Sequence, residues 1–186
     1  EDAKALIFEG IEDEYAGFIQ KCDDYRNKVQ LKTIETLKSL SEQGIDFYMI
    51  SKYNFPEMPV YKNAVNLSDG ITSVKRQSFG AICAEHDGVL SESYIKSLKD
   101  TKYLSPDRMI DASTCLFPET SYFIKNMYHD TFPAPINNLA IDLMNHDATV
   151  SGGEYAQYTL YDGSNELKII SGQDENDTVE KEPFYM

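Results

Sequence analysis

The sequence predicts an α/β fold with a parallel sheet, and three observations support this prediction. Residues 30 to 43 repeat apolar side chains at helical spacing, and Gly44 stands where a helix commonly ends on a left-handed residue. A short apolar run, residues 45 to 51, follows at once and is typical of a strand buried on both faces. Residues 121 to 126 form a second strand candidate. Helix, glycine and buried strand in succession make up half of a βαβ unit, which favours a parallel sheet.

Composition and charge limit the class of protein. The chain has 186 residues, 41% of them hydrophobic, which is enough for a domain with a substantial core. Its net charge of -14 argues against nucleic acid and anionic membranes as partners, because phosphates need Lys and Arg. No run of about 18 apolar residues occurs, so no membrane-spanning helix is expected.

The chain begins at Glu1 without Met and without the pattern of a signal peptide. We therefore expect either a mature product or a piece of a longer protein. The compartment stays open, with a secreted or cell-surface location favoured.

The N-terminal part predicts two helices. Residues 11 to 29 and residues 30 to 43 each place apolar side chains on one helical face. We expect the face of the first helix to pack into a core. Its side chains are Tyr15, Phe18, Ile19, Cys22, Tyr25 and Val29, and those of the second helix are Leu31, Ile34, Leu37 and Leu40.

Loops and short elements separate the two predicted strands. Residues 52 to 69 form a long loop with two prolines, and loops of this length in compact domains are often functional. Residues 74 to 84 are ambiguous. Residues 91 to 100 predict a short helix, and residues 105 to 120 predict a loop.

A helix and a hairpin are predicted after the second strand. The helix follows Pro133 and carries Ile136, Leu139, Ala140, Leu143 and Met144 at the spacing of core residues. Residues 150 to 172 alternate about the turn sequence YDGSN, which predicts a β-hairpin. An acidic tail ends the chain.

Two residues are candidates for acid-base chemistry. Asp69 precedes a glycine at the end of the loop that leaves the first strand, and His129 lies between the second strand and its helix. Sites in open α/β sheets gather beyond the carboxyl ends of strands, where both residues fall. A carboxylate bonded to imidazole Nδ1 is the acid-base half of a Ser-His-Asp triad. The acid also precedes the base, as in α/β-hydrolases.

At these residues the chain resembles a known family. The stretch MISKYNFPEMPVYKNAVNLSDGITSVKRQS is similar to the region of lecithin-cholesterol-acyltransferase-like lipases that runs from the penultimate strand to the catalytic acid. Asp69, Gly70 and Ser78 hold the places of that motif. The segment DASTCLFPETSYFIKNMYHDTFP resembles the final strand and catalytic histidine of bacterial lipase-like hydrolases, with His129 in that place. Together, residues 45 to 146 resemble the C-terminal half of α/β-hydrolase lipases and esterases.

The resemblance implies hydrolysis of a carboxylic ester or lipid by a Ser-His-Asp mechanism, with no metal or organic cofactor. In that mechanism His129 is the base and Asp69 orients it. It also implies three parts of the chain. Residues 1–44 would be lid or cap helices with the helix before the penultimate strand, 45–147 the C-terminal part of the hydrolase sheet with its flanking helices, and 148–186 a hairpin and tail.

The chain departs from the family at the nucleophile. The elbow G-x-S-x-G needs small residues around a Ser on a sharp turn, and no such pentapeptide occurs in the sequence. The nearest stretches, residues 151 to 153 and 162 to 165, follow the histidine, which is the wrong order. We therefore expect the serine in a missing N-terminal part of a larger hydrolase. A half-sheet would also expose a strand edge, so we expect the missing N-terminal segment or a second chain as a partner, or poor solubility.

Several other residues allow a functional and a structural interpretation. The stretch Glu85 to Gly88 could supply a second acid or calcium ligands, but a solvated turn is favoured. Asp111 could orient the histidine loop or bind a metal, but a cap is favoured. His146 suits the end of a helix. Cys83 and Cys115 could pair, or all three cysteines could be buried thiols.

The alternative function is a non-catalytic binding or interaction module. It would use the same half-fold together with the tyrosines of the hairpin, Tyr155, Tyr158 and Tyr161. For these tyrosines an added edge hairpin is the favoured interpretation. Likewise, the aromatic side chains of residues 11 to 29 could line an acyl pocket if these helices form a lid.

Overall fold

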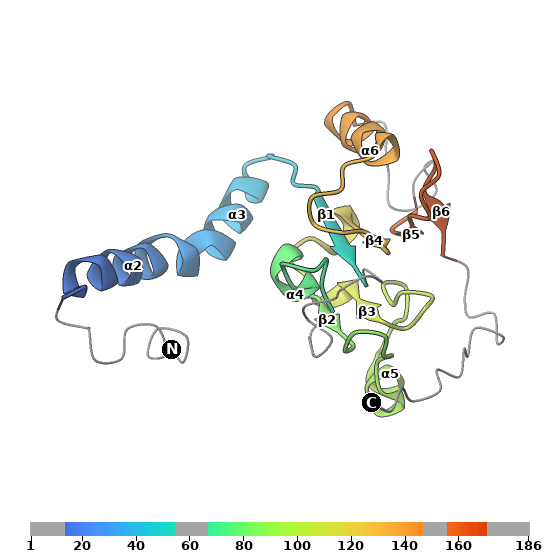
Figure 1. Ribbon diagram of the computed structural model, residues 1–186. Helices are drawn as coiled ribbons and strands as arrows, with labels where there is room; N and C mark the ends of the chain where they lie inside the picture. Colours follow the sequence, from blue (N-terminus) through green and yellow to red (C-terminus); the bar gives the residue numbers. More distant parts are fainter. Residues whose placement is uncertain (1–13, 55–66, 147–155, 171–186) are drawn as a thin grey trace, which may run out of the picture. The chain divides into compact units, whose positions relative to one another are not determined.

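The computed structural model describes residues 14–54, 67–146 and 156–170 and shows a mixed α/β architecture (Figure 1). The chain divides into two compact units, Glu1–Asp46 and Phe47–Met186. The first unit ends two residues beyond the boundary expected after residue 44. The hairpin, expected as a third part, lies in the second unit.

Within its described residues, the first unit contains two helices, as the sequence predicts. They are α2 (Ala16–Lys28) and α3 (Thr33–Glu42), joined by the 3₁₀ turn η1 (Gln30–Lys32). Gly44 has a φ of +89° and ends α3, with its N–H donating to the carbonyl of Ser41 and that of Ile45 to the carbonyl of Leu40. This pair of bonds is the Schellman motif, which explains why a glycine follows the helix.

The expected core packing of the first helix is not found. None of the described residues of α2, η1 or α3 is buried. The apolar side chains that remain exposed are Tyr15, Phe18, Tyr25, Val29, Leu31 and Ile34.

The second unit is organised around a four-stranded, mostly parallel sheet. Its order is β1 (Met49–Tyr53), β4 (Ser121–Lys125), β5 (Tyr158–Leu160) and β6 (Lys168–Ile169). The first three strands run parallel and β6 is antiparallel. The parallel sheet and the buried character of its first strand are confirmed, although β1 begins four residues later than the apolar run.

The predicted hairpin is confirmed, and it is part of the main sheet. Strands β5 and β6 form its two arms, and β5 also pairs in parallel with β4. Tyr158 stacks on Phe123 of β4 with ring centroids 5.3 Å apart, so it is a core residue and not part of a docking surface. Tyr155 and the acidic tail lie outside the described residues.

Each face of the sheet has its own apolar core, because successive side chains of β4 point to opposite faces. Tyr122 and Ile124 pack with α6 (Ala134–Met144) on one face. Phe123 packs on the other face against Val74 and Ile110, from the layer that contains α4 (Val74–Gln77), β2 (Ile82–Cys83) and β3 (Ile110–Asp111). Figure 1 shows α6 and this second layer on opposite sides of the strands.

The connection between β1 and β4 contains more structure than the sequence predicts. The ambiguous residues 74 to 84 divide into α4 and β2. The predicted loop, residues 105 to 120, contains β3 and two 3₁₀ turns, η2 (Ala112–Thr114) and η3 (Pro118–Thr120). Two-residue strands such as β2 and β3 are too short for a period to be visible in sequence. The predicted short helix is confirmed as α5 (Glu92–Ser97), capped by Ser91.

Within the described part of the chain, no helix has the length and apolar character needed to cross a membrane.

Helix α6 allows a direct test of which side chains hold the sheet. Leu139 is 1% exposed, whereas Met144, expected in the core from its spacing, is 72% exposed. We expect Leu139→Ala to lower the free energy of unfolding by about 2–5 kcal/mol, because it leaves a cavity. The matched Met144→Ala should change it by less than about 0.5 kcal/mol. Urea denaturation measures both, and equal losses would contradict the assigned packing.

Candidate active site

The parallel pairing of β1 with β4 brings two loops to one edge of the sheet. Each strand is followed at once by an asparagine in the left-handed region, Asn54 with φ +50° and Asn126 with φ +61°. Asparagine tolerates this conformation better than most residues. The N–H of Asn126 donates to the carbonyl of Tyr53 over 2.8 Å, so the segments that follow β1 and β4 leave the sheet side by side. Asp69 lies beyond the first turn and His129 beyond the second.

Asp69 is held by its own turn. The carboxylate Oδ1 accepts from the backbone N–H groups of Ile71, at 3.0 Å, and Thr72, at 2.7 Å. Gly70, with φ +100°, provides the left-handed residue that the turn needs. Asp69 is only 2% exposed. It is therefore both the turn residue that Asp-Gly predicts and a buried acid with one carboxylate oxygen left for another partner.

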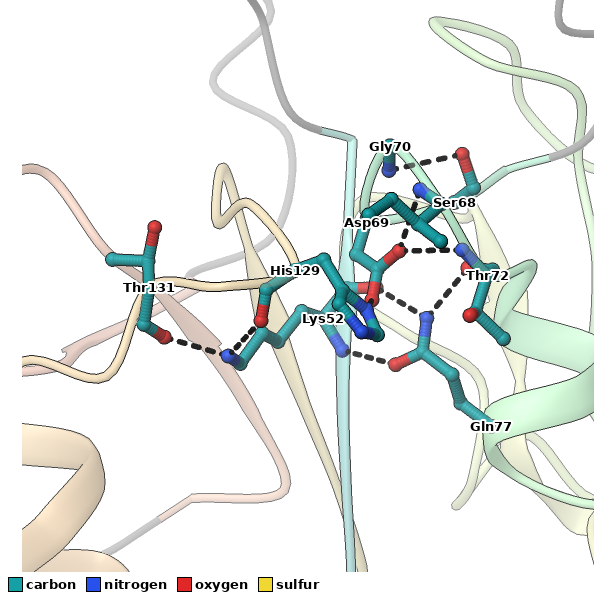
Figure 2. Close-up of polar contacts among 9 residues, drawn as sticks. Lys52, Ser68, Asp69, Gly70, Thr72, Gln77, His129 and Thr131 are labelled. Atoms are coloured by element: carbon teal, nitrogen blue, oxygen red, sulfur yellow. Dashed lines mark hydrogen bonds and ion pairs between the residues drawn. The ribbon is translucent and has the colours of Figure 1, made fainter.

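That partner is His129. Its Nδ1 lies 2.7 Å from Oδ2 of Asp69, and its backbone N–H donates to the carbonyl of Asp69 over 3.0 Å. Because a carboxylate only accepts, Nδ1 carries the proton and Nε2 of the neutral ring is left as an acceptor. The imidazole is 42% exposed, and no described residue hydrogen-bonds its Nε2. The structure thus brings the two predicted residues together as a carboxylate–imidazole pair (Figure 2).

Lys52 of β1 lies next to this pair and was not predicted. It is 6% exposed, and its Nζ donates to the carbonyl oxygens of His129, at 2.8 Å, and Thr131, at 2.6 Å. The ammonium also lies 3.6 Å from the ring centroid of Phe132. Burial lowers the pKa of Lys52, and the negative charges of Asp69 and Asp130 oppose this shift. The sequence predicts residue 52 at the start of a loop, whereas the structure places Lys52 within β1, and nothing in the sequence indicates that its side chain turns to the backbone of a distant loop.

Gln77 at the end of α4 is the other residue that sequence missed. Its Oε1 accepts from the N–H of Lys52 at 2.8 Å, and its Nε2 donates to the carbonyls of Lys52, at 3.1 Å, and Thr72, at 2.7 Å. The side-chain amide therefore connects β1 to the turn that carries Asp69.

Ser78, the serine that matches the lipase motif, has a structural place. It is fully buried, its hydroxyl donates to the carbonyl of Val74 over 2.7 Å, and it accepts from the N–H of Ala81 over 3.0 Å. These bonds end α4 and satisfy the hydroxyl. Among the described serines, none hydrogen-bonds His129.

The rival candidates take the structural roles that the sequence favoured. The stretch Glu85 to Gly88 forms a turn, in which His86 and Asp87 approach only to 3.9 Å. Asp111 caps η2 through the N–H of Ser113 and also accepts from the hydroxyl of Tyr94 over 2.7 Å. His146 follows α6, and its Nδ1 lies 3.2 Å from the hydroxyl of Tyr48. The described residues contain no group of three or more potential metal ligands.

The cysteines are all free thiols. Cys22 is exposed, Cys115 is buried and Cys83 is intermediate, so the structure supports neither the pairing of Cys83 with Cys115 nor the burial of all three. Burial raises the pKa of Cys83 to about 12. It also raises the pKa of Cys115. Both are therefore poor nucleophiles at neutral pH.

A second polar cluster lies at the same edge of the sheet, where Tyr53 and Lys125 end their strands. Asp107 Oδ2 accepts from the Tyr53 hydroxyl over 3.1 Å and from Lys125 Nζ over 3.0 Å. Burial, and then the charge of Asp107, raise the pKa of Tyr53 well above its usual value of 10.0. This cluster joins the loop before β3 to the ends of both strands.

Comparison with known proteins adds no family to this geometry. No family model matches the chain, and no curated protein or solved structure shows significant similarity to it.

We expect nitrogen-15 NMR of the chain to show neutral His129 as the tautomer with a proton on Nδ1, because Asp69 can only accept. Asp69→Asn should lose this preference, since an amide can either donate to Nδ1 or accept from it. The rings of His86 and His146 serve as internal controls and should not change. An Nε2–H tautomer of His129 in the unsubstituted chain would contradict the assigned bond.

The Tyr53 cluster should make stability fall at alkaline pH. The raised pKa keeps Tyr53 protonated in the folded state, while the unfolded state loses this proton above about pH 10. The contribution is therefore fully present below pH 10 and is lost as pH rises towards the folded-state pKa. We expect the free energy of unfolding of Tyr53→Phe to decline less steeply above pH 10 in urea titrations. Parallel curves for the two proteins would contradict this assignment.

Proposed function

We propose that this chain supplies the acid and base of a serine ester hydrolase of the lipase or esterase class. The observation that carries the proposal is the Asp69–His129 pair, with a buried, doubly anchored carboxylate bound to Nδ1 of a half-exposed imidazole. The parallel sheet that presents both residues beyond its carboxyl edge supports it, as does the sequence resemblance around them.

In this function, His129 Nε2 accepts the proton of a serine hydroxyl while the serine oxygen attacks the ester carbonyl carbon. The same proton then passes to the alkoxide leaving group, which departs as the alcohol and leaves an acyl-enzyme. Water repeats the sequence, and the carboxylic acid is released. Asp69 keeps its negative charge throughout and stabilises the imidazolium that forms at each step.

The serine is proposed to come from outside these 186 residues, from an N-terminal part of a longer protein or from a second chain. The sequence lacks the G-x-S-x-G elbow, and the hydroxyl of Ser78 is buried and already bonded. The first unit, with its exposed apolar side chains, is proposed as part of a lid or cap.

A non-catalytic module is the second candidate. The observation that favours it is that no described serine hydrogen-bonds His129, and in this candidate the pair serves only to join two loops. The two candidates differ in whether substitution of the pair changes chemistry or only stability.

The test uses the complete product of the natural gene, with hydrolysis of a p-nitrophenyl ester as the readout. We expect Asp69→Asn to lower kcat by about 10⁴-fold, because it removes the partner that holds the reactive tautomer. His129→Ala should abolish turnover to a similar extent. The same product should react with a fluorophosphonate at one serine, and His129→Ala should slow this labelling.

The matched controls are His86→Ala and Asp87→Asn. These two residues are a second histidine and aspartate that lie close together, 3.9 Å apart. Neither should alter turnover by more than about twofold, since surface substitutions change little. If the complete product shows no turnover and no labelling while it is folded, the hydrolase proposal is wrong and the module is favoured.

A further inference from the structure

Lys52 is buried without a carboxylate partner among the described residues. Its Nζ donates to the carbonyls of His129 and Thr131, and its remaining contact is the ring of Phe132. Burying an ammonium costs free energy unless its donors are satisfied, and here backbone carbonyls of one loop accept two of its three donors. Lys125 of the neighbouring strand is different, because it forms an ion pair with Asp107. Lys52 therefore fixes a loop through hydrogen bonds, and within the described part of the chain it forms no ion pair at salt-bridge distance.

The loop that Lys52 fixes is the one that carries the base. Lys52 holds the carbonyl of His129, while Asp69 holds its N–H and its Nδ1. Three contacts from two neighbouring segments thus set the backbone and the ring direction of a single residue. Nε2 is the one polar atom of His129 without a described partner.

The backbone of the same lysine holds the acid. Gln77 bonds both the N–H and the carbonyl of Lys52, and it donates to the carbonyl of Thr72. The N–H of Thr72 in turn donates to Asp69 Oδ1. The hydrogen bonds therefore form a closed ring through His129, Lys52, Gln77, Thr72 and Asp69.

Figure 2 shows this arrangement, with Lys52 between the His129 and Thr131 loop on one side and Gln77 on the other. Strand β1 lies at one end of the described strand order. The side chain of Gln77 bonds the N–H and the carbonyl of Lys52, the two groups that a further strand would bond at this edge. These two bonds attach the end of α4 to β1.

We infer that Lys52, with Gln77 as its partner, is the positioning residue that holds Asp69 and His129 at bonding distance. One residue of β1 sets both halves of the pair, the base through its side chain and the acid through its backbone. The kinetic part of this inference rests on the proposed function, whereas the geometric part does not.

The test compares two variants. Lys52→Met keeps the length of the side chain and removes its donors. Gln77→Glu keeps an acceptor for the N–H of Lys52 and removes the two bonds that Gln77 donates. The first readout is the Nδ1–H proton resonance of His129 in the 186-residue chain. We expect both variants to broaden or shift it. Lys102→Met is the matched control, because Lys102 also lies over an aromatic ring and donates to oxygen, but at Tyr103 and Glu119. It should leave the resonance unchanged.

The second readout is ester turnover by the complete gene product. Misplacement of a base by a fraction of an ångström lowers the chemical step, so kcat should fall on the order of tenfold or more with KM changed by less than about twofold. Because both residues act through one ring, the double variant should lose about as much as the worse single variant.

The outcomes separate the two proposals. An unchanged His129 resonance in folded Lys52→Met and Gln77→Glu, with unchanged kcat, would overturn the positioning role. A shifted resonance in both variants, with no turnover even in the unsubstituted product, would support the positioning role and overturn the hydrolase. Urea denaturation identifies a variant that fails to fold, in which case the other variant decides.

Discussion

The candidate site depends on the parallel pairing of β1 with β4. These strands lie 72 residues apart in sequence, from Met49 to Ser121, yet they pair in register over five residues. The pairing places their carboxyl ends at one edge and brings the loops of Asp69 and His129 within hydrogen-bond reach. A slip of one residue would move one loop by about 3.3 Å along the other and turn Lys52 to the opposite face. The two bonds that join the loops, from Lys52 Nζ to the carbonyl of His129 and between Asp69 and His129 Nδ1, would be lost in such a shift.

Polar contacts, more than apolar packing, define the geometry at that edge. The two cores on either face of the sheet hold the strands and extend to Leu67 and Met127, each two residues before a member of the pair. Beyond them, Asp69 and Lys52 are both buried, and each is surrounded by groups of the main chain. Hydrogen bonds in a low-dielectric setting are strong and costly to break, so a network of this kind can hold a few side chains in one arrangement.

In this arrangement the imidazole of His129 is the exposed member of the group. The carboxylate and the ammonium are buried, while the imidazole is partly exposed with its Nε2 outward from the bond to Asp69. A buried acid behind a half-exposed base is compatible with proton transfer from a nucleophile, and this is the basis of the hydrolase proposal. Ser78 is separate from this arrangement, because both bonds of its hydroxyl lie at the end of α4.

The sequence by itself determined the features that depend on local chemistry. The helix end at Gly44, the buried strands, the helix after His129 and the hairpin about YDGSN all follow from periodicity and turn residues. Asp69 and His129 could be selected because both follow strands. Only the tertiary structure decided that β5 joins β4, that β2 and β3 form a second layer, and that Met144 faces outward. It alone also assigned Lys52 and Gln77 to the site. Their partners are backbone groups at distances of 25 and 77 residues along the chain, and a backbone carbonyl has no signature in sequence.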